Sequence, residues 1–284
     1  MIIAGWHYLG MATVIIPPGT ANPVPLIADG DKVHLIEGEQ DYSGTSLDLS
    51  ALANGLNLLK FGKLCRVKNS ASNPWKVDVD QGTNPHVLVA GGGPHYFHPG
   101  GGSSLITRFK MLAPGRAFFI GGGTVTNFEQ RSGISDFSSA VIATNAYLGG
   151  GQCTIASNAT AITLLEVGPG ASAIIKRSIT TGTFFGGNVA CKADDSSGTL
   201  PTGGTIKNYG ADVTWMFGAI TSLELRGPNA TFDISNAPKD FSIGTLIIDS
   251  WAKRNPKNKL VSQHAVITLP TPTVRFDETD DLSI

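Results

Sequence analysis

The feature that most constrains the fold of this chain is a weak internal repeat in its second half. Residues 162–172 (ITLLEVGPGAS) resemble residues 220–231 (ITSLELRGPNAT), with one residue inserted in the second copy, and residues 206–213 (IKNYGADV) form a fainter copy between them. Glycines typical of turns recur with a similar rhythm at Gly149, Gly168, Gly187, Gly210, Gly227 and Gly244. A period of about 20 residues, with about three short strands in each, is typical of one coil of a β-solenoid.

Stacking explains why such a repeat favours a solenoid. A single coil cannot bury its inward Ile, Val, Leu and Phe side chains, but a second coil at the ~4.8 Å strand spacing covers them and pairs the backbone groups. The alternative is a β-sandwich or jelly roll, whose strands recur every ~8–12 residues. The repeat favours the solenoid for residues 121–250. Strands are predicted there at 124–126, 140–143, 153–155, 162–167, 173–175, 204–207, 212–217, 222–225, 231–234 and 245–248.

The composition agrees with an all-β protein. Charged residues make up 15% of the chain and 35 of the 284 residues are glycine, whereas an ordinary domain has about 25% charged residues and about 7% glycine. Helical bundles and coiled coils, which are rich in Ala, Glu, Lys, Leu and Arg, are therefore excluded. The net charge of −1 gives no basic surplus of the kind that nucleic-acid-binding proteins carry.

Four segments are predicted. Residues 1–30 form an extended Pro-rich arm and residues 31–120 a smaller β-rich domain, with one short helical turn near 48–59. Residues 121–250 form the solenoid. Residues 251–284 contain an exposed basic loop at 251–259, a last strand at 265–269 and an acidic tail at 277–281. Residues 1–28 carry no charged side chain, but glycines and a proline pair interrupt the apolar run too early for a membrane span, and no membrane partner is expected.

The search for chemistry predicts no catalytic, cofactor or metal site. His95 and His98 lie three residues apart in a glycine-rich loop without a third ligand nearby, which favours a structural role over metal binding. Asp194 and Asp195 are read as part of a corner loop. Other acidic residues stand alone in the second half (Asp233, Asp240 and Asp249).

Three further groups of residues receive structural interpretations. Cys65, Cys153 and Cys191 have no metal-binding spacing and are predicted to be buried, reduced thiols, in agreement with assembly in a reducing cytoplasm. The basic stretch 253–259 beside Trp251 is read as a solvated loop rather than a nucleic-acid site. The four tryptophans are dispersed and form no sugar-binding stripe (Trp6, Trp75, Trp215 and Trp251).

Three sequence features together resemble bacteriophage virion structural proteins of the β-helical capsid-decoration (cement) or head-fibre type. They are the start at residues 11–16 followed by a Pro/Gly arm, the run 47–52 (LDLSAL) ahead of 56–62, and the coil pattern of 220–227 and 230–235. The resemblance implies a non-enzymatic homotrimer that attaches to the major capsid protein. It implies a location on the capsid surface of the virion after assembly in the host cytoplasm, and it carries over no catalytic residues or cofactor.

The arm is the predicted contact with the capsid or with neighbouring protomers. Its prolines prevent a helix, so it is expected to lie extended along a partner surface. The predicted contact residues are Val14, Ile15, Ile16, Pro17, Pro18, Pro23, Pro25 and Leu26. Two alternatives remain: a tail, tailspike or receptor-binding fibre component that binds host glycan, and a β-helical polysaccharide-degrading enzyme.

Overall fold

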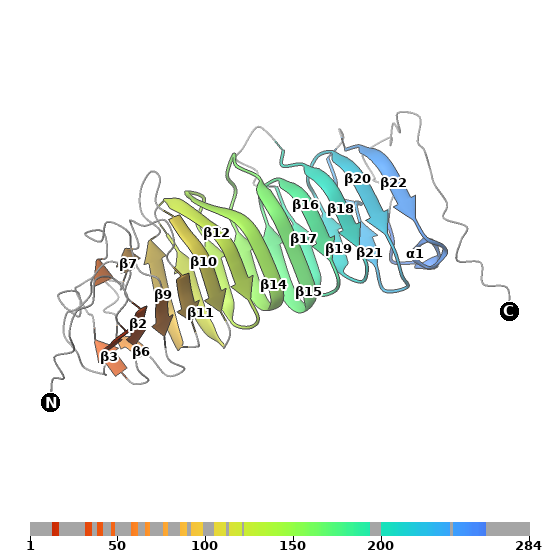
Figure 1. Ribbon diagram of the computed structural model, residues 1–284. Coiled ribbons are helices and arrows are strands. Elements are labelled where there is room, and N and C mark those ends of the chain that lie inside the picture. Colours follow the sequence, from red (N-terminus) through yellow and green to blue (C-terminus); the bar gives the residue numbers. More distant parts are fainter. Residues whose placement is uncertain are drawn as a thin grey trace. The chain divides into compact units, whose positions relative to one another are not determined.

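The computed structural model is a β-solenoid, as the repeat predicts (Figure 1). It describes residues 108–259 with their side chains, except 112–113, 121, 194–199, 239–240 and the side chain of Lys253, and ahead of them the backbone of the strands alone. The chain divides into two compact units, residues 1–143 and 144–284. Each unit is built from parallel strands that pair from one coil to the next.

The first unit contains two parallel ladders and one small sheet. The first ladder joins β1 (Thr13–Ile16), β2 (Lys32–Leu35), β5 (Leu58–Phe61), β8 (His86–Val89), β10 (Leu105–Met111) and β12 (Gly123–Gln130). The second joins β4 (Leu47–Asp48), β7 (Lys76–Asp78), β9 (Gly92–His98), β11 (Gly115–Phe119) and β13 (Ile134–Phe137). Strands β3 (Glu39–Asp41) and β6 (Arg66–Lys68) form a separate parallel pair.

Two predictions from the sequence can be compared with the structure of the first unit. Solenoid-type parallel pairing already begins at Thr13, well ahead of residue 121. The helical turn predicted near 48–59 is wrong at both of its ends, because Asp48 ends β4 and Leu58 begins β5. The residues between them lie outside the described part of the chain.

Phenylalanines fill the described interior of the first unit. Phe109, Phe119, Phe128 and Phe137 are each 0% exposed. Phe119 and Phe137 occupy the same register position in neighbouring coils, and their rings stack with centroids 4.1 Å apart. Phe109 meets Phe119 edge to face at 4.7 Å. Such offset and edge-to-face contacts add to the stabilisation from burial alone.

The second unit also contains two ladders, here called ladder A and ladder B. Long strands β14 (Val141–Ile155) and β15 (Ile162–Ile175) contribute to both ladders. Ladder A continues through β16 (Ile179–Phe184), β18 (Gly203–Asn208), β20 (Ile220–Leu225) and β22 (Ile243–Ile248). Ladder B continues through β17 (Asn188–Cys191), β19 (Asp212–Trp215) and β21 (Thr231–Asp233). A described coil of this unit thus has two strands, or one long strand that serves both ladders, and not the three that the sequence predicts.

The strand register confirms the internal repeat. The first residues of the ladder A strands lie above one another, and so do the fourth residues. The two copies of the repeat seen in the sequence therefore occupy equivalent positions in the stack of coils. The first column is Ile162, Ile179, Gly203, Ile220 and Ile243. Shorter and longer coils alternate along this column, because the second and fourth intervals contain more residues than the first and third.

Two of the inward positions of ladder A hold a glycine instead of a large apolar residue. At each of them a neighbouring side chain fills the space that a larger residue would take. A Cβ on Gly203 would lie 2.7 Å from the ring of Trp215, which is 0% exposed. A Cβ on Gly182 would lie 3.0 Å from both Phe184 and Ile206. The core therefore stays filled although the repeat is broken in the sequence.

Corners between ladders A and B explain several of the other glycines. Gly187 and Gly227 have φ angles of +77° and +84°, which a residue without Cβ adopts at little cost. Gly210 lies between β18 and β19, whereas Gly149 and Gly168 lie within the long strands β14 and β15, where the register of the pair shifts between Leu148 and Gly150. The prediction of Gly244 as a turn glycine is wrong, because it is the second residue of β22.

Candidate functional site

The described carboxylates among the candidates are engaged in the fold. Asp233 accepts hydrogen bonds from the backbone N–H (2.8 Å) and hydroxyl (2.6 Å) of Ser235, and it pairs with Lys259 at 2.9 Å. Asp249 accepts from the N–H groups of Ala252 and Gly227 at 2.6 and 2.7 Å. Asp194, Asp195 and Asp240 lie outside the described residues. The described candidates thus hold a turn and a helix cap, and they are more buried than the solvated turn acids that the sequence indicates.

The histidine prediction needs a correction. His95 and His98 lie in strand β9, not in a loop, with His95 in register with Ala117 and His98 with Asp78. Their side chains are outside the described part. Over the residues whose side chains the structure describes, no group of three or more His, Cys, Asp or Glu is placed to hold a metal ion.

Two of the three cysteines are buried, as predicted. Cys153 and Cys191 are 2% and 0% exposed and lie on inward positions of ladder B. Burial raises the pKa of the Cys191 thiol well above its ordinary value, so this thiol is a packing group with low reactivity. Cys65 lies outside the described residues.

A buried arginine is a feature that sequence reasoning missed. Arg177 is 0% exposed and follows β15, and its Nε donates a hydrogen bond to the carbonyl of Ala156 at 2.8 Å. Burial lowers the pKa of Arg177 to about 10. The guanidinium therefore remains charged at neutral pH while it ties one coil to the preceding one.

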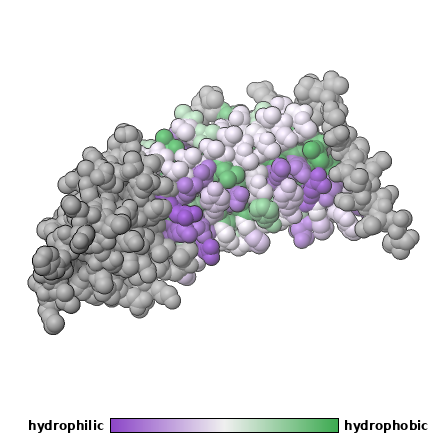
Figure 2. Space-filling model, in the orientation of Figure 1, coloured by the Kyte–Doolittle hydropathy of each residue, from purple (hydrophilic) through white to green (hydrophobic). Residues whose placement is uncertain are grey.

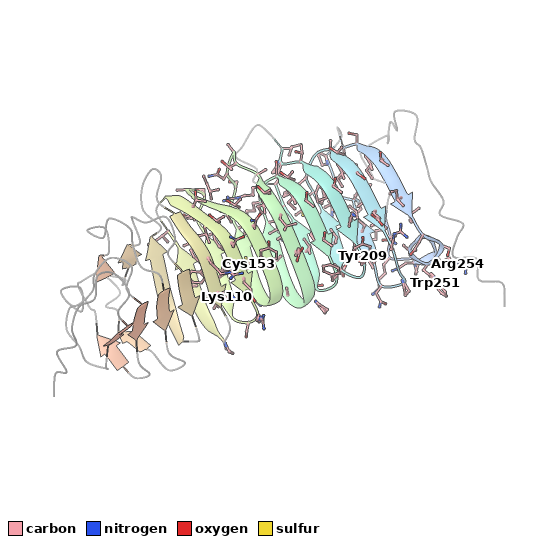
Figure 3. All side chains as sticks on the ribbon, in the orientation of Figure 1. Lys110, Cys153, Tyr209, Trp251 and Arg254 are labelled. Carbon is pink, nitrogen blue, oxygen red and sulfur yellow. The ribbon has the colours of Figure 1, made fainter. Side chains whose placement is uncertain are left out.

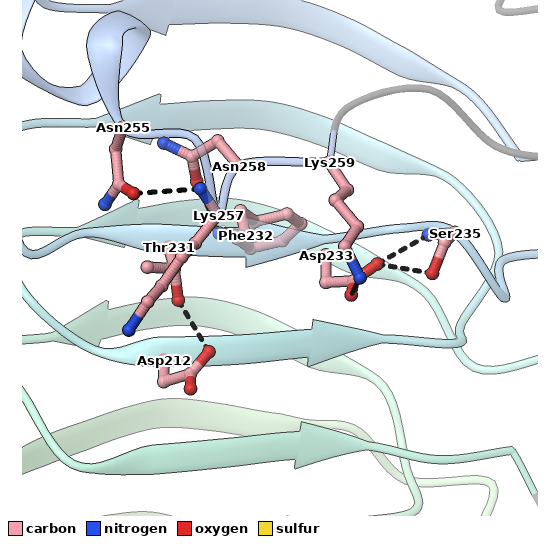
Figure 4. Close-up of polar contacts among 9 residues, drawn as sticks. All are labelled: Asp212, Thr231, Phe232, Asp233, Ser235, Asn255, Lys257, Asn258 and Lys259. Atoms are coloured by element: carbon pink, nitrogen blue, oxygen red, sulfur yellow. Dashed lines mark hydrogen bonds and ion pairs between the residues drawn. The ribbon is translucent and has the colours of Figure 1, made fainter.

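The segment predicted as an exposed basic loop, 251–259, is instead a cap on ladder B. It begins in helix α1 (Ser250–Arg254), with Asp249 as the N-cap residue. Asn258 accepts a hydrogen bond from the backbone N–H of Phe232 at 2.6 Å, and Figure 4 labels both residues. The amide of Asn258 also donates to the carbonyl of Ala230 at 3.1 Å. The backbone of Lys259 then pairs with β21 on both sides of Asp233. The cap therefore occupies the position of a further ladder B strand.

The charges of this cap are arranged around one carboxylate. Partial burial raises the pKa of Asp233, but hydrogen bonds from Ser235 and the charge of Lys259 outweigh it and hold the pKa below its ordinary value. Trp251 and Arg254, which Figure 3 labels, are exposed. Lys257 is exposed as well, so Arg254 and Lys257 make the outer surface of the cap basic, as predicted.

An equivalent cross-strand pair lies on the first unit. Lys110 of β10 and Glu129 of β12 share a register position and form an ion pair at 3.2 Å, and Arg131 joins it at 2.9 Å. Partial burial raises the pKa of Glu129, but these two cations outweigh it and lower the pKa overall. The arrangement stabilises the ladder and leaves this carboxylate ionised at neutral pH.

Outward positions of ladder A carry small hydroxyl side chains. The third residues of β16, β18, β20 and β22 are Thr181, Thr205, Ser222 and Thr245, which lie in one column. Much of the visible described surface is accordingly near the middle of the hydropathy scale, with separate polar patches (Figure 2). Such a face is hydrated without being strongly charged.

One corner column differs from this pattern. The residues following the ladder A strands place Phe185 and Tyr209 in neighbouring coils, and their rings stack with centroids 5.8 Å apart and planes 26° apart. Phe185 is 53% exposed. The preceding coil has Gly168 at this position, so the column of aromatic residues does not continue there. The pair joins the exposed ring of Phe185 to the half-buried ring of Tyr209. Sequence reasoning missed it, because the dispersed tryptophans alone indicate no aromatic stripe.

Few of the predicted partner-contact residues can be placed. Val14, Ile15 and Ile16 lie in β1, which pairs in parallel with β2, so this part of the predicted arm belongs to the first ladder. The remaining contact residues lie outside the described part (Pro17, Pro18, Pro23, Pro25 and Leu26).

Comparison with known proteins gives no relative for this chain. No protein-family model, no curated protein and no solved structure matches it. Of the helices in the described residues, none has the length and apolar character needed to cross a membrane.

Proposed function

We propose that this chain is a non-enzymatic structural protein of a bacteriophage particle that attaches to the capsid lattice and stabilises the head. The observation that carries the proposal is the in-register stack of coils in the second unit, with apolar columns inside and short hydroxyl side chains outside. A stack of this kind holds its surface residues at fixed spacings, because each coil is hydrogen-bonded to both of its neighbours. A fixed array of surface positions suits attachment to a repeating partner.

Attachment is proposed to run through the neutral N-terminal residues. Their apolar side chains and prolines match a partner surface without charge complementarity, and the proposed partners are the major capsid protein and further copies of this chain. Several weak contacts on a lattice give high avidity, because the second contact is made at high effective concentration. A homotrimer would supply three such contacts.

Mass spectrometry and cryo-EM of purified phage particles from the source of this chain would test the proposal. Many copies per particle, arranged with the symmetry of the capsid, would support it. A few copies at one vertex would indicate a tail component instead, and absence from the particles would overturn the structural role.

A second experiment addresses the attachment residues. The full chain with Pro23→Ala, Pro25→Ala and Leu26→Asp leaves β1 unchanged, and we expect it to lose co-sedimentation with capsids that lack the native protein. The matched control carries Ser222→Ala and Thr245→Ala on ladder A. Equal capsid binding by both variants would contradict the assignment of the arm.

One observation favours a second candidate function, a receptor-binding tail or fibre component. The exposed ring of Phe185 stacks on the half-buried ring of Tyr209, and an exposed aromatic face suits stacking on the apolar face of a sugar ring. A glycan array with the wild-type chain and Phe185→Ala would test it, with Thr181→Ala as control. Binding lost only in Phe185→Ala would favour the glycan-binding alternative. Turnover of a polysaccharide by the chain would contradict the non-enzymatic proposal and favour the third reading, a polysaccharide-degrading enzyme.

A further inference from the structure

The C-terminal cap covers ladder B, whereas within the described residues no strand follows β22 on ladder A. The inward fourth residues of the earlier ladder A strands are fully buried: Leu165, Ile206 and Leu223 are each 0% exposed. Leu246, at the same position of β22, is only half-buried. An apolar position and a strand edge thus remain at the end of ladder A.

The first backbone N–H of each ladder A strand has a regular hydrogen-bond acceptor in the next coil. In four successive coils the first residue of the ladder A strand donates its N–H to the carbonyl immediately before the next such strand. These bonds run from Ile162 to Ser178, Ile179 to Thr202, Gly203 to Ala219, and Ile220 to Ser242, at 2.8–2.9 Å. Ile243 begins β22 and needs the equivalent acceptor, since an unpaired strand edge is a site of aggregation.

The remaining sequence contains a segment that matches the pattern. The last two described ladder A strands begin with an inward apolar residue, an exposed residue, a hydroxyl residue and a Leu on the inward side, in 220–223 (ITSL) and 243–246 (IGTL). Residues 266–269 (VITL) repeat the first apolar, the hydroxyl and the Leu positions, with Ile267 at the exposed one, and Val266 lies as far beyond Ile243 along the chain as Ile243 lies beyond Ile220. We propose that Val266–Leu269 of the same chain forms the next ladder A strand on β22.

The connection has a suitable length. Each coil returns from the ladder B column to the start of the next ladder A strand, and these returns differ in length. The shortest runs from Ile174 to Ile179 and the longest, which includes residues 194–199, from Ala190 to Gly203. Lys259 pairs with Asp233 and so occupies the next position of the ladder B column. The run from Lys259 to Val266 is longer than the shortest return and shorter than the longest.

A proline directly after the proposed strand would end it. Pro270 would occupy the position of Ile247, the fifth residue of β22, where the chain has no N–H to donate. A proline in the outermost strand discourages pairing with another copy. The proposal is independent of the proposed function, because it concerns only how the stack is closed.

A cysteine cross-link in the full chain tests the register. Thr245→Cys with Thr268→Cys places two thiols at the same outward position of neighbouring coils, within reach of a disulfide. We expect an intramolecular 245–268 link by peptide mapping after mild oxidation. The matched control, Thr245→Cys with Thr271→Cys, is out of register and should give no link. Equal linkage in both pairs, or a link only between chains, would overturn the proposal and in the second case identify another copy as the occupant.

Hydrogen exchange gives a test without substitution at the edge. In the wild-type chain the amide of Ile243 should exchange about as slowly as that of Ile220, and Leu269→Asp should accelerate it about tenfold or more while Leu282→Asp leaves it unchanged. Fast exchange of Ile243 in the wild type would overturn the proposal.

Discussion

At the scale of single residues, the stack depends on positions where one coil compensates for a change in its neighbour. Gly203 stands in a column of isoleucines, and the ring of Trp215 takes the space that a side chain there would fill. A substitution that restores the repeat in the sequence would therefore damage the packing of the fold.

We expect Gly203→Ile to destabilise the protein by about 1–3 kcal/mol, because overpacking forces the Trp215 ring from its place. Chemical denaturation measures the change. Thr205→Ile on the outward side of the same strand serves as control and should cost less. A stability of Gly203→Ile equal to wild type would show that the ring moves without cost.

Asn208 carries the second prediction at this scale. It occupies an inward position that is Leu225 in the next coil, and it is 0% exposed. Its amide donates to the carbonyls of Ala211 and Thr231 at 3.0 and 2.9 Å, and its oxygen accepts from the N–H groups of Gly210 and Ala211. Asn208→Leu follows the repeat but leaves these backbone groups unsatisfied, so we expect a loss of about 2–4 kcal/mol in denaturant unfolding. Leu225→Val at the equivalent position should cost less.

At the scale of elements, the C-terminal cap holds two pieces together through Asp249. The same carboxylate caps α1 and binds the N–H of Gly227 at the corner between β20 and β21. We expect Asp249→Ala to cost roughly 0.5–2 kcal/mol and to raise hydrogen exchange at the end of ladder B first. Asp249→Asn keeps an oxygen acceptor and should lose less. Equal losses for both variants would show that the negative charge, not the hydrogen bond, matters.

The cap also contributes to the stability of the folded protein in a way that depends on pH. The pKa of Asp233 is lowered in the folded state, so its contribution is present above the pKa of the unfolded chain and is lost as the pH falls through the folded value. The difference in stability between wild type and Asp233→Asn should be present at pH 6 and shrink below about pH 4. Because Lys259 is 59% exposed and screened by water, the difference should be at most about 1 kcal/mol. A difference that does not change between these pH values would contradict the assignment.

At the scale of the whole molecule, the sequence predicts the coil but not every part of it. The predicted strands at 162–167, 222–225 and 245–248 are confirmed, because apolar residues recur at their inward positions. The sequence does not predict strand β16, since Gly182 interrupts its apolar pattern, and the space is filled by Phe184 of the same strand and Ile206 of the next coil. It does not predict β17 either, which has only four residues. The cap was missed for a related reason: Asn258 bonds residues 26 and 28 positions earlier, and no local pattern records that contact.

The stacking of coils also predicts that the protein tolerates the insertion of a further complete coil. Each coil bonds only to its neighbours, so a second copy of residues 203–219 inserted after Ala219 should add one coil in register. We expect the same strand signal per residue in circular dichroism and a melting temperature close to wild type. A second copy of residues 203–211 alone supplies one strand without its ladder B partner and should lower the melting temperature. Unfolding of the full-coil insertion would contradict nearest-neighbour stability.

The unequal coil lengths in the second unit have a practical result for anyone who wishes to display a peptide on this protein. The longer coils, which begin at Ile179 and Ile220, alternate with the shorter ones that begin at Ile162 and Gly203. Their additional residues follow β17 and β21, which occupy the same ladder B column two levels apart. Neighbouring coils lie ~4.8 Å apart, so epitopes grafted after β17 and β21 would be attached about 10 Å apart. The backbone fixes this distance, and it can be changed only by whole coils.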